Sequence, residues 1–208
     1  MIGTMAGPEL AALPAEEDLV AAARRGDRQA FDRLVEMHTP RVWRVVWRIL
    51  RHREDAEDVV QEVFLAAHGA LPEFRGEARF TTWLHSIAVR RALNARRSAA
   101  GKARRAALSL VAGAGAAGEG TMPEERLADD SAAASPLRSL EAGELRRRLA
   151  RCLEQLPASW RAVLALREGE SLSYQEIAAI LKTALGTVRS RLARARLALR
   201  RCVEGSTP

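Results

Sequence analysis

Residues 171–203 read SLSYQEIAAILKTALGTVRSRLARARLALRRCV, and this stretch decides the fold of the carboxyl-terminal part of the chain. Ser173 can cap a helix that runs through Leu181, because a serine hydroxyl accepts a hydrogen bond from a free backbone N–H of the first helical turn. Residues 182–184 then form a short turn, and a long helix starts near Leu185. Two helices joined by one tight turn predict a helix-turn-helix motif.

The two faces of this motif differ in chemistry. Apolar side chains form the wedge where the helices must meet: Ile177, Leu181, Val188 and Leu192. Polar and basic side chains of the second helix point outward: Arg189, Ser190, Arg191, Arg194 and Arg196. A recognition helix places its outward residues in the major groove, where arginine can donate paired hydrogen bonds to guanine. The motif therefore predicts duplex DNA binding, with Arg194, Arg200 and Arg201 better placed for phosphates.

Charge and composition agree with a helical protein that binds a polyanion. The chain has 208 residues, 33 Lys and Arg against 26 Asp and Glu, and a net charge of +7. Residues 141–208 hold 13 basic and 7 acidic side chains, so this third carries most of the excess. Alanine and leucine dominate the apolar residues, which excludes an all-β fold. The sequence contains no apolar run long enough for a membrane span and no secretory signal.

The rest of the chain predicts an all-α fold with two small helical domains. Asp27 is a plausible cap, and Trp43, Val46 and Trp47 recur at helical spacing. Residues 101–140 are rich in Ala, Gly and Ser without sustained helical periodicity, which predicts a flexible linker. The expected organisation is a tail at 1–16, a helical domain at 17–100, a linker at 101–140, a helix-turn-helix domain at 141–203 and a tail at 204–208.

The two cysteines are Cys152 and Cys202, 50 positions apart with no CxxC pattern. They make neither a zinc motif nor a disulfide framework. Each falls on an apolar helical stripe, the first with Leu145, Leu149 and Leu153. We expect two unpaired, buried thiols in a reducing cytoplasm, with a redox pair as the alternative.

Residues 54–71 predict a helix with an acidic face. Val59, Val63 and their neighbours form the apolar stripe. The opposite side carries four polar residues: Asp55, Asp58, Gln61 and Glu62. Three readings are open: a solvated face, a docking surface for a basic partner, or a divalent metal site. The metal reading is the weakest, because no histidine, fourth carboxylate or Gly-rich loop accompanies the carboxylates.

A loop with aromatic residues and a basic helix follow. Pro72 and Gly76 punctuate a loop that carries Phe74 and Arg75. From Phe80 onward, an apolar stripe and a polar outer face alternate as in an amphipathic helix. The outer face holds Thr82, Ser86, Arg90, Asn94 and Arg97. Cations suit phosphates and aromatic faces suit unstacked bases, so this segment fits an opening nucleic acid. The alternative places Phe80 and Trp83 in the core.

Three segments together resemble the extracytoplasmic-function (group 4) sigma factors of bacterial RNA polymerase. They are DAEDVVQEVF at 55–64, FRGEARFTTWL at 74–84, and SYQEIA at 173–178 with GTVRSRL at 186–192. The resemblance implies that residues 17–100 form sigma region 2 and residues 141–203 form sigma region 4. It also implies that the linker threads through polymerase channels.

The resemblance implies a role for each matching residue. Asp55, Asp58, Gln61 and Glu62 would dock on the β′ clamp helices of core polymerase. The −10 element would be bound and melted by Phe74, Arg75, Phe80, Thr82, Trp83, Arg90, Arg91 and Asn94. The −35 duplex would be read by Tyr174, Thr187, Arg189, Ser190, Arg191 and Arg194. Further implied partners are the β flap and an anti-sigma factor, often membrane-bound. The protein would act in the cytoplasm without a cofactor, a metal, catalysis or membrane insertion.

The sequence departs from the family in the turn of the helix-turn-helix. Lys182 stands where glycine is common, and Ala184 and Leu185 replace the usual residues before Gly186. We therefore expect backbone strain at Lys182. Two other functions are possible for this sequence. The first is a free-standing helix-turn-helix regulator, but such a protein needs neither the acidic face nor the aromatic loop. The second is an enzyme that acts on nucleic acid, but the sequence shows no nucleophile–base pair and no phosphate loop.

Overall fold

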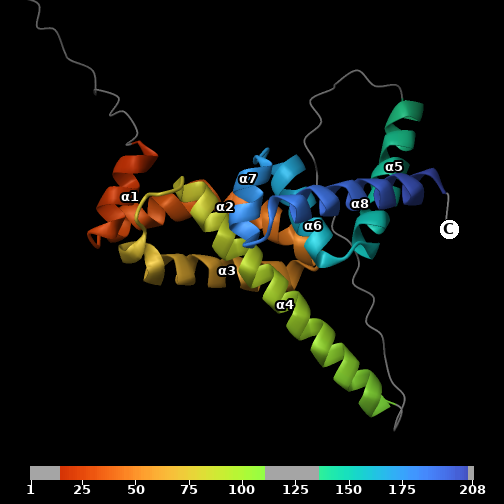
Figure 1. The fold of residues 1–208 in the computed structure, drawn as a ribbon, viewed down its shortest axis with the longest axis horizontal. Helices are drawn as coiled ribbons and strands as arrows, with labels where there is room; N and C mark the ends of the chain where they lie inside the picture. Colours follow the sequence, from red (N-terminus) through yellow and green to blue (C-terminus); the bar gives the residue numbers. More distant parts are fainter. Residues whose placement is uncertain (1–14, 111–135, 206–208) are drawn as a thin grey trace, which may run out of the picture.

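The computed structural model describes residues 15–110 and 136–205, and within these ranges it contains helices and no strand (Figure 1). This confirms the predicted all-α fold. The amino-terminal half consists of α1 (Glu16–Arg24), α2 (Arg28–Leu50), α3 (Arg53–Ala70), a 3₁₀ turn (Leu71–Glu73) and α4 (Phe80–Leu110). The carboxyl-terminal half consists of α5 (Pro136–Gln155), α6 (Ala158–Leu164), a π turn (Ala165–Gly169), α7 (Tyr174–Leu181) and α8 (Leu185–Glu204).

Local signals set the helix ends of the amino-terminal half. The Asp27 carboxylate accepts a hydrogen bond of 3.1 Å from the Ala30 backbone N–H, which confirms Asp27 as a cap. The helix α2 ends at Arg51 in a left-handed conformation, and His52 caps α3 directly afterwards. The helices α2, α3 and α4 then pack on one another around a shared core, with α1 against α2.

Helical structure extends into the segment expected as a linker. The helix α4 continues to Leu110 and projects beyond the other helices, and α5 already begins at Pro136 (Figure 1). Residues 101–110 read GKARRAALSL, and alanine, arginine and leucine are strong helix formers, so propensity here outweighs the missing apolar periodicity. The remainder of the expected linker, 111–135, and residues 1–14 and 206–208 lie outside the described residues.

The helix-turn-helix is confirmed between α7 and α8. Ser173 and Glu176 form a reciprocal capping box, in which the Ser173 hydroxyl accepts from the Glu176 backbone N–H at 3.2 Å. Lys182 ends α7 in the left-handed region, with φ 48° and ψ 51°. The wedge is buried as expected at Ile177, Val188 and Leu192, so the backbone strain at Lys182 is held in place by the packing on either side of it.

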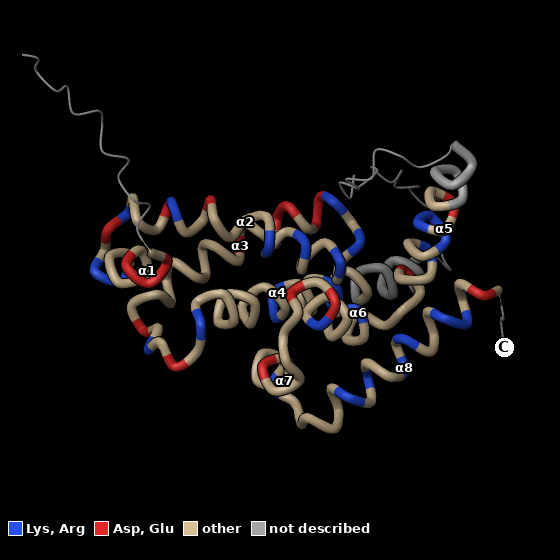
Figure 2. The backbone as a smooth tube through the Cα atoms, turned by 90° about the horizontal axis from the view of Figure 1, so that it is seen from above, with Lys and Arg blue, Asp and Glu red and all other residues tan. Residues whose placement is uncertain are grey.

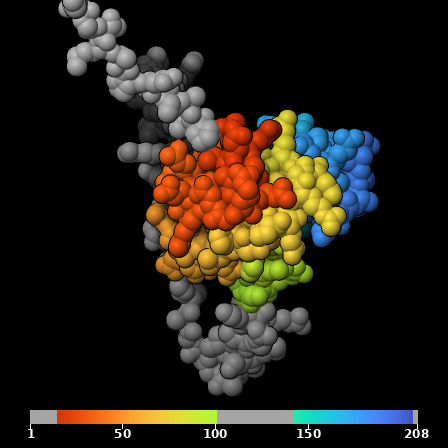
Figure 3. All heavy atoms as spheres, turned by 90° about the vertical axis from the view of Figure 1, so that its left-hand side faces the viewer, coloured from red at the N-terminus to blue at the C-terminus, as the bar shows by residue number. Residues whose placement is uncertain are grey.

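The two halves share one continuous core. Helix α6 and the π turn pack against α2, and α7 packs against α4. In the space-filling view, the blue carboxyl-terminal half adjoins the yellow segment that precedes and begins α4 (Figure 3). Arg44 of α2 and His85 of α4 both pair with Glu170, at 3.8 Å each, so charged groups as well as apolar ones cross the boundary between the halves.

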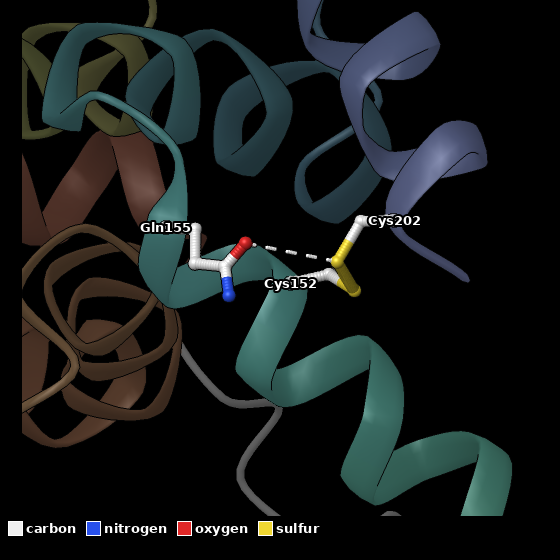
Figure 4. Close-up of a disulfide and its surroundings, with 3 residues drawn as sticks. All are labelled: Cys152, Gln155 and Cys202. Atoms are coloured by element: carbon white, nitrogen blue, oxygen red, sulfur yellow. Dashed lines mark hydrogen bonds between the residues drawn. A yellow bond between two sulfur atoms is a disulfide. The ribbon is translucent and has the colours of Figure 1, made fainter. Parts of the chain in front are cut away.

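The expectation of two unpaired thiols is wrong. Cys152 of α5 and Cys202 of α8 form a disulfide, with their Cα atoms 5.8 Å apart (Figure 4). The reason is tertiary: α5 lies against α8, so that cysteines 50 positions apart become neighbours. The predicted apolar stripe of α5 is only partly covered, since Leu145 and Leu149 remain 54% and 39% exposed.

Candidate functional site

The basic face of α8 is open to solvent. Figure 2 shows Lys and Arg recurring along this helix. Arg189 and Arg194 are exposed, whereas Ser190 and Arg191 are half-buried. The Ser190 hydroxyl donates a hydrogen bond of 3.1 Å to the Thr187 carbonyl, one turn earlier in the same helix. Within the described residues, Arg189 and Arg194 have no ion-pair partner, so their guanidinium groups are available to an anionic ligand.

Neighbouring residues fix the edge of this face. Arg167 lies over the Tyr174 ring, 5.1 Å from its centroid, and donates a 2.8 Å hydrogen bond to the Leu172 carbonyl. Arg196 forms an ion pair with Glu168, and the hydrogen bonds that Arg196 donates to the Glu168 carboxylate raise the Arg196 pKa. Tyr174 and Arg196 are therefore engaged within the protein, which leaves the start of α8 as the unpaired part of the surface.

The acidic face of α3 is also open. The four predicted docking residues, Asp55, Asp58, Gln61 and Glu62, are all exposed, while Val59 and Val63 of the opposite stripe are buried. Asp55 lies 3.6 Å from His52, and Glu62 pairs with Arg91 of α4 at 3.2 Å. No group of three or more His, Cys, Asp or Glu side chains in the described ranges could hold a metal ion. The metal reading of this face therefore has no geometric support.

An exposed leucine joins the acidic face. Leu65 is 74% exposed and stands at helical spacing i, i+3, i+4, i+7 with Asp58, Gln61 and Glu62. A large apolar side chain beside carboxylates suits a protein partner better than DNA. Leu65 is not among the residues predicted from the sequence, although its place on the same helical face as Asp58 could have revealed it.

The aromatic residues of the predicted −10 surface pack inward. Phe74 lies in a loop, as expected, but its ring is buried against Trp83, with centroids 4.9 Å apart. Phe80 is also buried, 5.5 Å from Trp83, which is partly exposed. The alternative that placed Phe80 and Trp83 in the core is therefore realised for Phe80. Of the predicted aromatic residues, Trp83 alone keeps part of its surface outside the core.

Thr82 faces the second half of the chain. It is only 9% exposed, although the sequence placed it on the outer face of α4. A cavity of about 280 Å³ separates this part of α4 from the loop before α7, and it is lined by Thr82, Arg41, Arg44, Arg79, Glu170 and Ser171. The outer face of α4 is thus covered at Thr82, in its first turn, which helical periodicity alone does not predict.

The later turns of α4 remain accessible. Arg75 and Arg90 are exposed, and Asn94 accepts a hydrogen bond from Arg97. Arg91 is half-buried and pairs with Glu62. Glu62 is predicted to dock on the polymerase and Arg91 to bind DNA. In this conformation the two side chains instead form an ion pair with each other.

The charged groups between the halves have shifted pKa values. Burial lowers the pKa of His85 to about 4, and the neighbouring His38, Arg41 and Arg44 act in the same direction. Burial also lowers the pKa of His38, against an opposing effect of Glu16. Burial raises the pKa of Glu170, although nearby arginines oppose it. Both imidazoles are therefore neutral at pH 7.

The chain matches two family models of known proteins. Residues 34–102 match Sigma-70 region 2, and residues 146–199 match Sigma-70, region 4. The first covers most of α2 to α4 with the acidic face, and the second covers the helix-turn-helix. The class of protein is thus a sigma-70 type transcription initiation factor.

Individual relatives narrow this class. The chain is 35% identical to the RNA polymerase sigma-H factor of Pseudomonas aeruginosa, over 91% of this chain and 94% of that protein. It is 36% identical to the ECF RNA polymerase sigma-E factor of Escherichia coli (strain K12), over 88% and 92%. The chain belongs to the extracytoplasmic-function sigma factors, and its function is that of an RNA polymerase sigma factor.

Solved structures share the fold. The structure of CnrH in complex with the cytosolic domain of CnrY has a TM-score of 0.61 at 24% identity, covering 93% of this chain and all of that one. The sigma factor RpoE in complex with the anti-sigma factor NepR from Bartonella quintana has a TM-score of 0.58 at 20% identity, covering 84% and 96%. None of the helices in the described ranges is long and apolar enough to cross a membrane.

Proposed function

We propose that the acidic face of α3 docks on core RNA polymerase while the basic face of α8 reads the −35 element. The observation that carries this proposal is the opposite charge of two exposed helical faces in one chain. Asp55, Asp58, Gln61 and Glu62 suit the β′ clamp helices, with Leu65 as an apolar contact. Arg189, Ser190, Arg191 and Arg194, with Tyr174 and Thr187 beside them, suit duplex DNA.

The −10 element is bound by the start of α4 and by the loop before it. Arg75, Arg90 and Asn94 are exposed and suit the DNA backbone. Phe74, Phe80 and Trp83 supply aromatic faces, and Thr82 and Arg91 complete the set, but the carboxyl-terminal half covers Thr82 and Glu62 holds Arg91. Use of this surface therefore requires both the carboxyl-terminal half and Glu62 to release it.

The chemistry we propose is binding and strand separation, with no bond made or broken by this chain. Region 2 comprises residues 17–100 and region 4 residues 141–203, joined by a linker at 101–140. The protein acts in the cytoplasm, where RNA polymerase works. The similar RpoE structure holds an anti-sigma factor, and we propose a partner of that kind here, together with the β flap for region 4.

The test is a charge reversal on α3. Asp58→Arg places a cation on the docking face, and we expect loss of co-elution with core RNA polymerase and of run-off transcription. Binding of the chain to −35 duplex DNA stays unchanged, because α8 is not altered. Glu17→Arg, an equal charge change at an exposed position of α1, is the matched control and keeps both activities.

Two other outcomes would contradict the proposal. Wild-type chain that binds specific duplex DNA but never co-elutes with core polymerase would favour the free-standing regulator. Asp58→Arg that transcribes as well as the Glu17→Arg control would remove the docking role from the acidic face.

A further inference from the structure

The disulfide links α5 to α8, the helix on which α5 packs. Cys152 is near the end of α5, and Cys202 is in the last turns of α8 (Figure 4). Their Cα separation of 5.8 Å is typical of a disulfide. The bridge closes a loop that contains α6, α7 and most of α8, so it ties the first helix of this half to the last.

The part of α5 whose side chains are described, residues 142–155, is mostly exposed. This helix packs chiefly against α8. Of the α5 residues whose burial is described, 142–155, only Cys152 is buried, whereas Leu145 and Leu149 are exposed. Its ion pair with the amino-terminal half, between Glu154 and Arg51, spans 4.0 Å. Because so little apolar surface is buried along α5, the sulfur bridge is a major part of its attachment.

The helix-turn-helix is held independently of the bridge. Ile177, Val188 and Leu192 are buried between α7 and α8, and the capping box fixes the start of α7. Arg189 stands more than three turns before Cys202 on the same helix. Opening the bridge therefore releases α5 while the recognition helix keeps its support.

Cys202 is the more exposed of the two bridged residues. Cys152 is buried, but Cys202 is partly exposed, with Gln155 Oε1 3.8 Å from its sulfur. Thiol–disulfide exchange begins with attack of a thiolate on a reachable sulfur. Attack on Cys202 forms a mixed disulfide and releases the Cys152 thiol, and a second external thiol then frees Cys202.

We propose that Cys152 and Cys202 form a redox-responsive clasp: oxidation by a low-molecular-weight disulfide fastens α5 to α8, and reduction by thiols releases it. The reaction is balanced, because two protein thiols and one external disulfide give one protein disulfide and two external thiols. The clasp does not depend on the function proposed above, since it concerns the attachment of α5 alone.

The first experiment measures the oxidation state. The full chain is equilibrated in buffers of stepped reduced to oxidised glutathione, quenched by thiol alkylation and weighed by mass spectrometry. We expect a reversible transition between the two-thiol and intramolecular disulfide forms within the range of these buffers. A pair that stays fully reduced in oxidised glutathione, or that forms only dimers between chains, would overturn the proposal.

The second experiment measures what the clasp holds. Hydrogen exchange of α5 in wild-type chain is expected to quicken at least tenfold on reduction, while α7 and the start of α8 keep their protection. The thermal midpoint falls by roughly 5–15 °C. The Cys152→Ser/Cys202→Ser variant is the control and behaves like the reduced chain in both buffers. Equal protection of α5 in oxidised and reduced wild-type chain would contradict the fastening role, and this comparison needs no variant to fold.

Discussion

The recognition helix α8 and the helix α4 are both amphipathic and basic, yet they present their polar faces differently. The start of α8 turns Arg189 and Arg194 to solvent. The start of α4 turns Thr82 toward the other half of the chain, and Arg91 pairs with Glu62. One of the two proposed DNA-binding surfaces is therefore exposed, and part of the other is covered by the protein itself.

The difference shows that a helix face is defined by what packs on it as well as by its sequence. Helix α8 lies along the outer edge of the molecule in the view from above (Figure 2). Helix α4 lies between α2 and α3 on one side and α7 on the other. The contrast therefore depends on the boundary between the halves, and substitutions in the shared core, at the boundary and on α8 test it.

The largest effect is expected from cavities in the shared core, one made in each half of the chain. Leu34→Ala and Leu192→Ala each truncate a side chain that is 1% exposed, one in each half. Each is expected to cost about 2–5 kcal/mol of unfolding free energy. Because both belong to one continuous core, urea unfolding followed by tryptophan fluorescence and circular dichroism should show a single transition for either variant. Leu65→Ala, at an exposed site, should change the free energy of unfolding little. Two separated transitions would show that the halves unfold independently.

The boundary should also respond to pH. The pKa of His85 is about 4 in the folded protein, below its ordinary 6.5, so the unfolded chain binds the proton first. The stabilising effect of a neutral His85 is complete above pH 6.5, is lost as the pH falls toward 4, and amounts to at most about 3 kcal/mol. The lowered pKa of His38 acts in the same direction, and the raised pKa of Glu170 partly offsets it.

Urea unfolding between pH 7 and 4 tests this prediction. His85→Gln cannot titrate and should flatten the dependence of stability on pH. His68→Gln, at an exposed position, is the control and should leave the dependence unchanged. A His85→Gln chain with the wild-type slope would mean that other groups govern the acid response.

Substitutions at the two ends of α8 should affect DNA binding differently, because one end is expected to contact bases and the other phosphates. Arg189→Ala is expected to cost roughly 1–3 kcal/mol of binding free energy and to relax the preference at one −35 position, because Arg189 is exposed in the first turns of the helix. Arg200→Ala, near the other end, should weaken binding equally on every duplex and reduce its salt dependence. Binding titrations on a set of single-base duplex variants measure both. Uniform loss for Arg189→Ala would assign that residue to phosphate.

The smallest effect concerns two left-handed residues, one in each half. Lys182 has φ 48° and Arg51 has φ 59°. Glycine adopts this conformation without steric cost, so Lys182→Gly should stabilise the chain by up to about 1 kcal/mol. Arg51→Gly should not, because the Arg51 side chain lies over Trp47, 5.4 Å from its ring centroid, and pairs with Glu154. Thermal unfolding of both variants decides whether the strain at Lys182 is relieved.

Local chemistry accounts for what could be predicted from the sequence. The caps at Asp27 and Ser173 and the wedge at Ile177 depend on residues within a few positions of one another, and the structure confirms them. The acidic face of α3 is exposed because its opposite stripe fills the core. Each of these features can therefore be predicted without knowing how the other half of the chain packs.

Contacts between distant segments account for what could not be predicted. The pairing of Cys152 with Cys202 requires α5 to lie on α8, and the covering of Thr82 requires the second half to pack on α4. The end of α4 at Leu110 reflects intrinsic propensity where apolar periodicity is weak. The roles assigned to individual site residues stay predictions.

The packing of α7 against α4 has a consequence for affinity. Some ligands would bind the chain only when its two halves are apart, in an open form. The apparent dissociation constant of such a ligand equals its intrinsic dissociation constant divided by the fraction of chains in the open form. Chains that favour the open form, through loss of the contacts made by Glu170, would therefore bind such a ligand more tightly although the binding surface itself is unchanged.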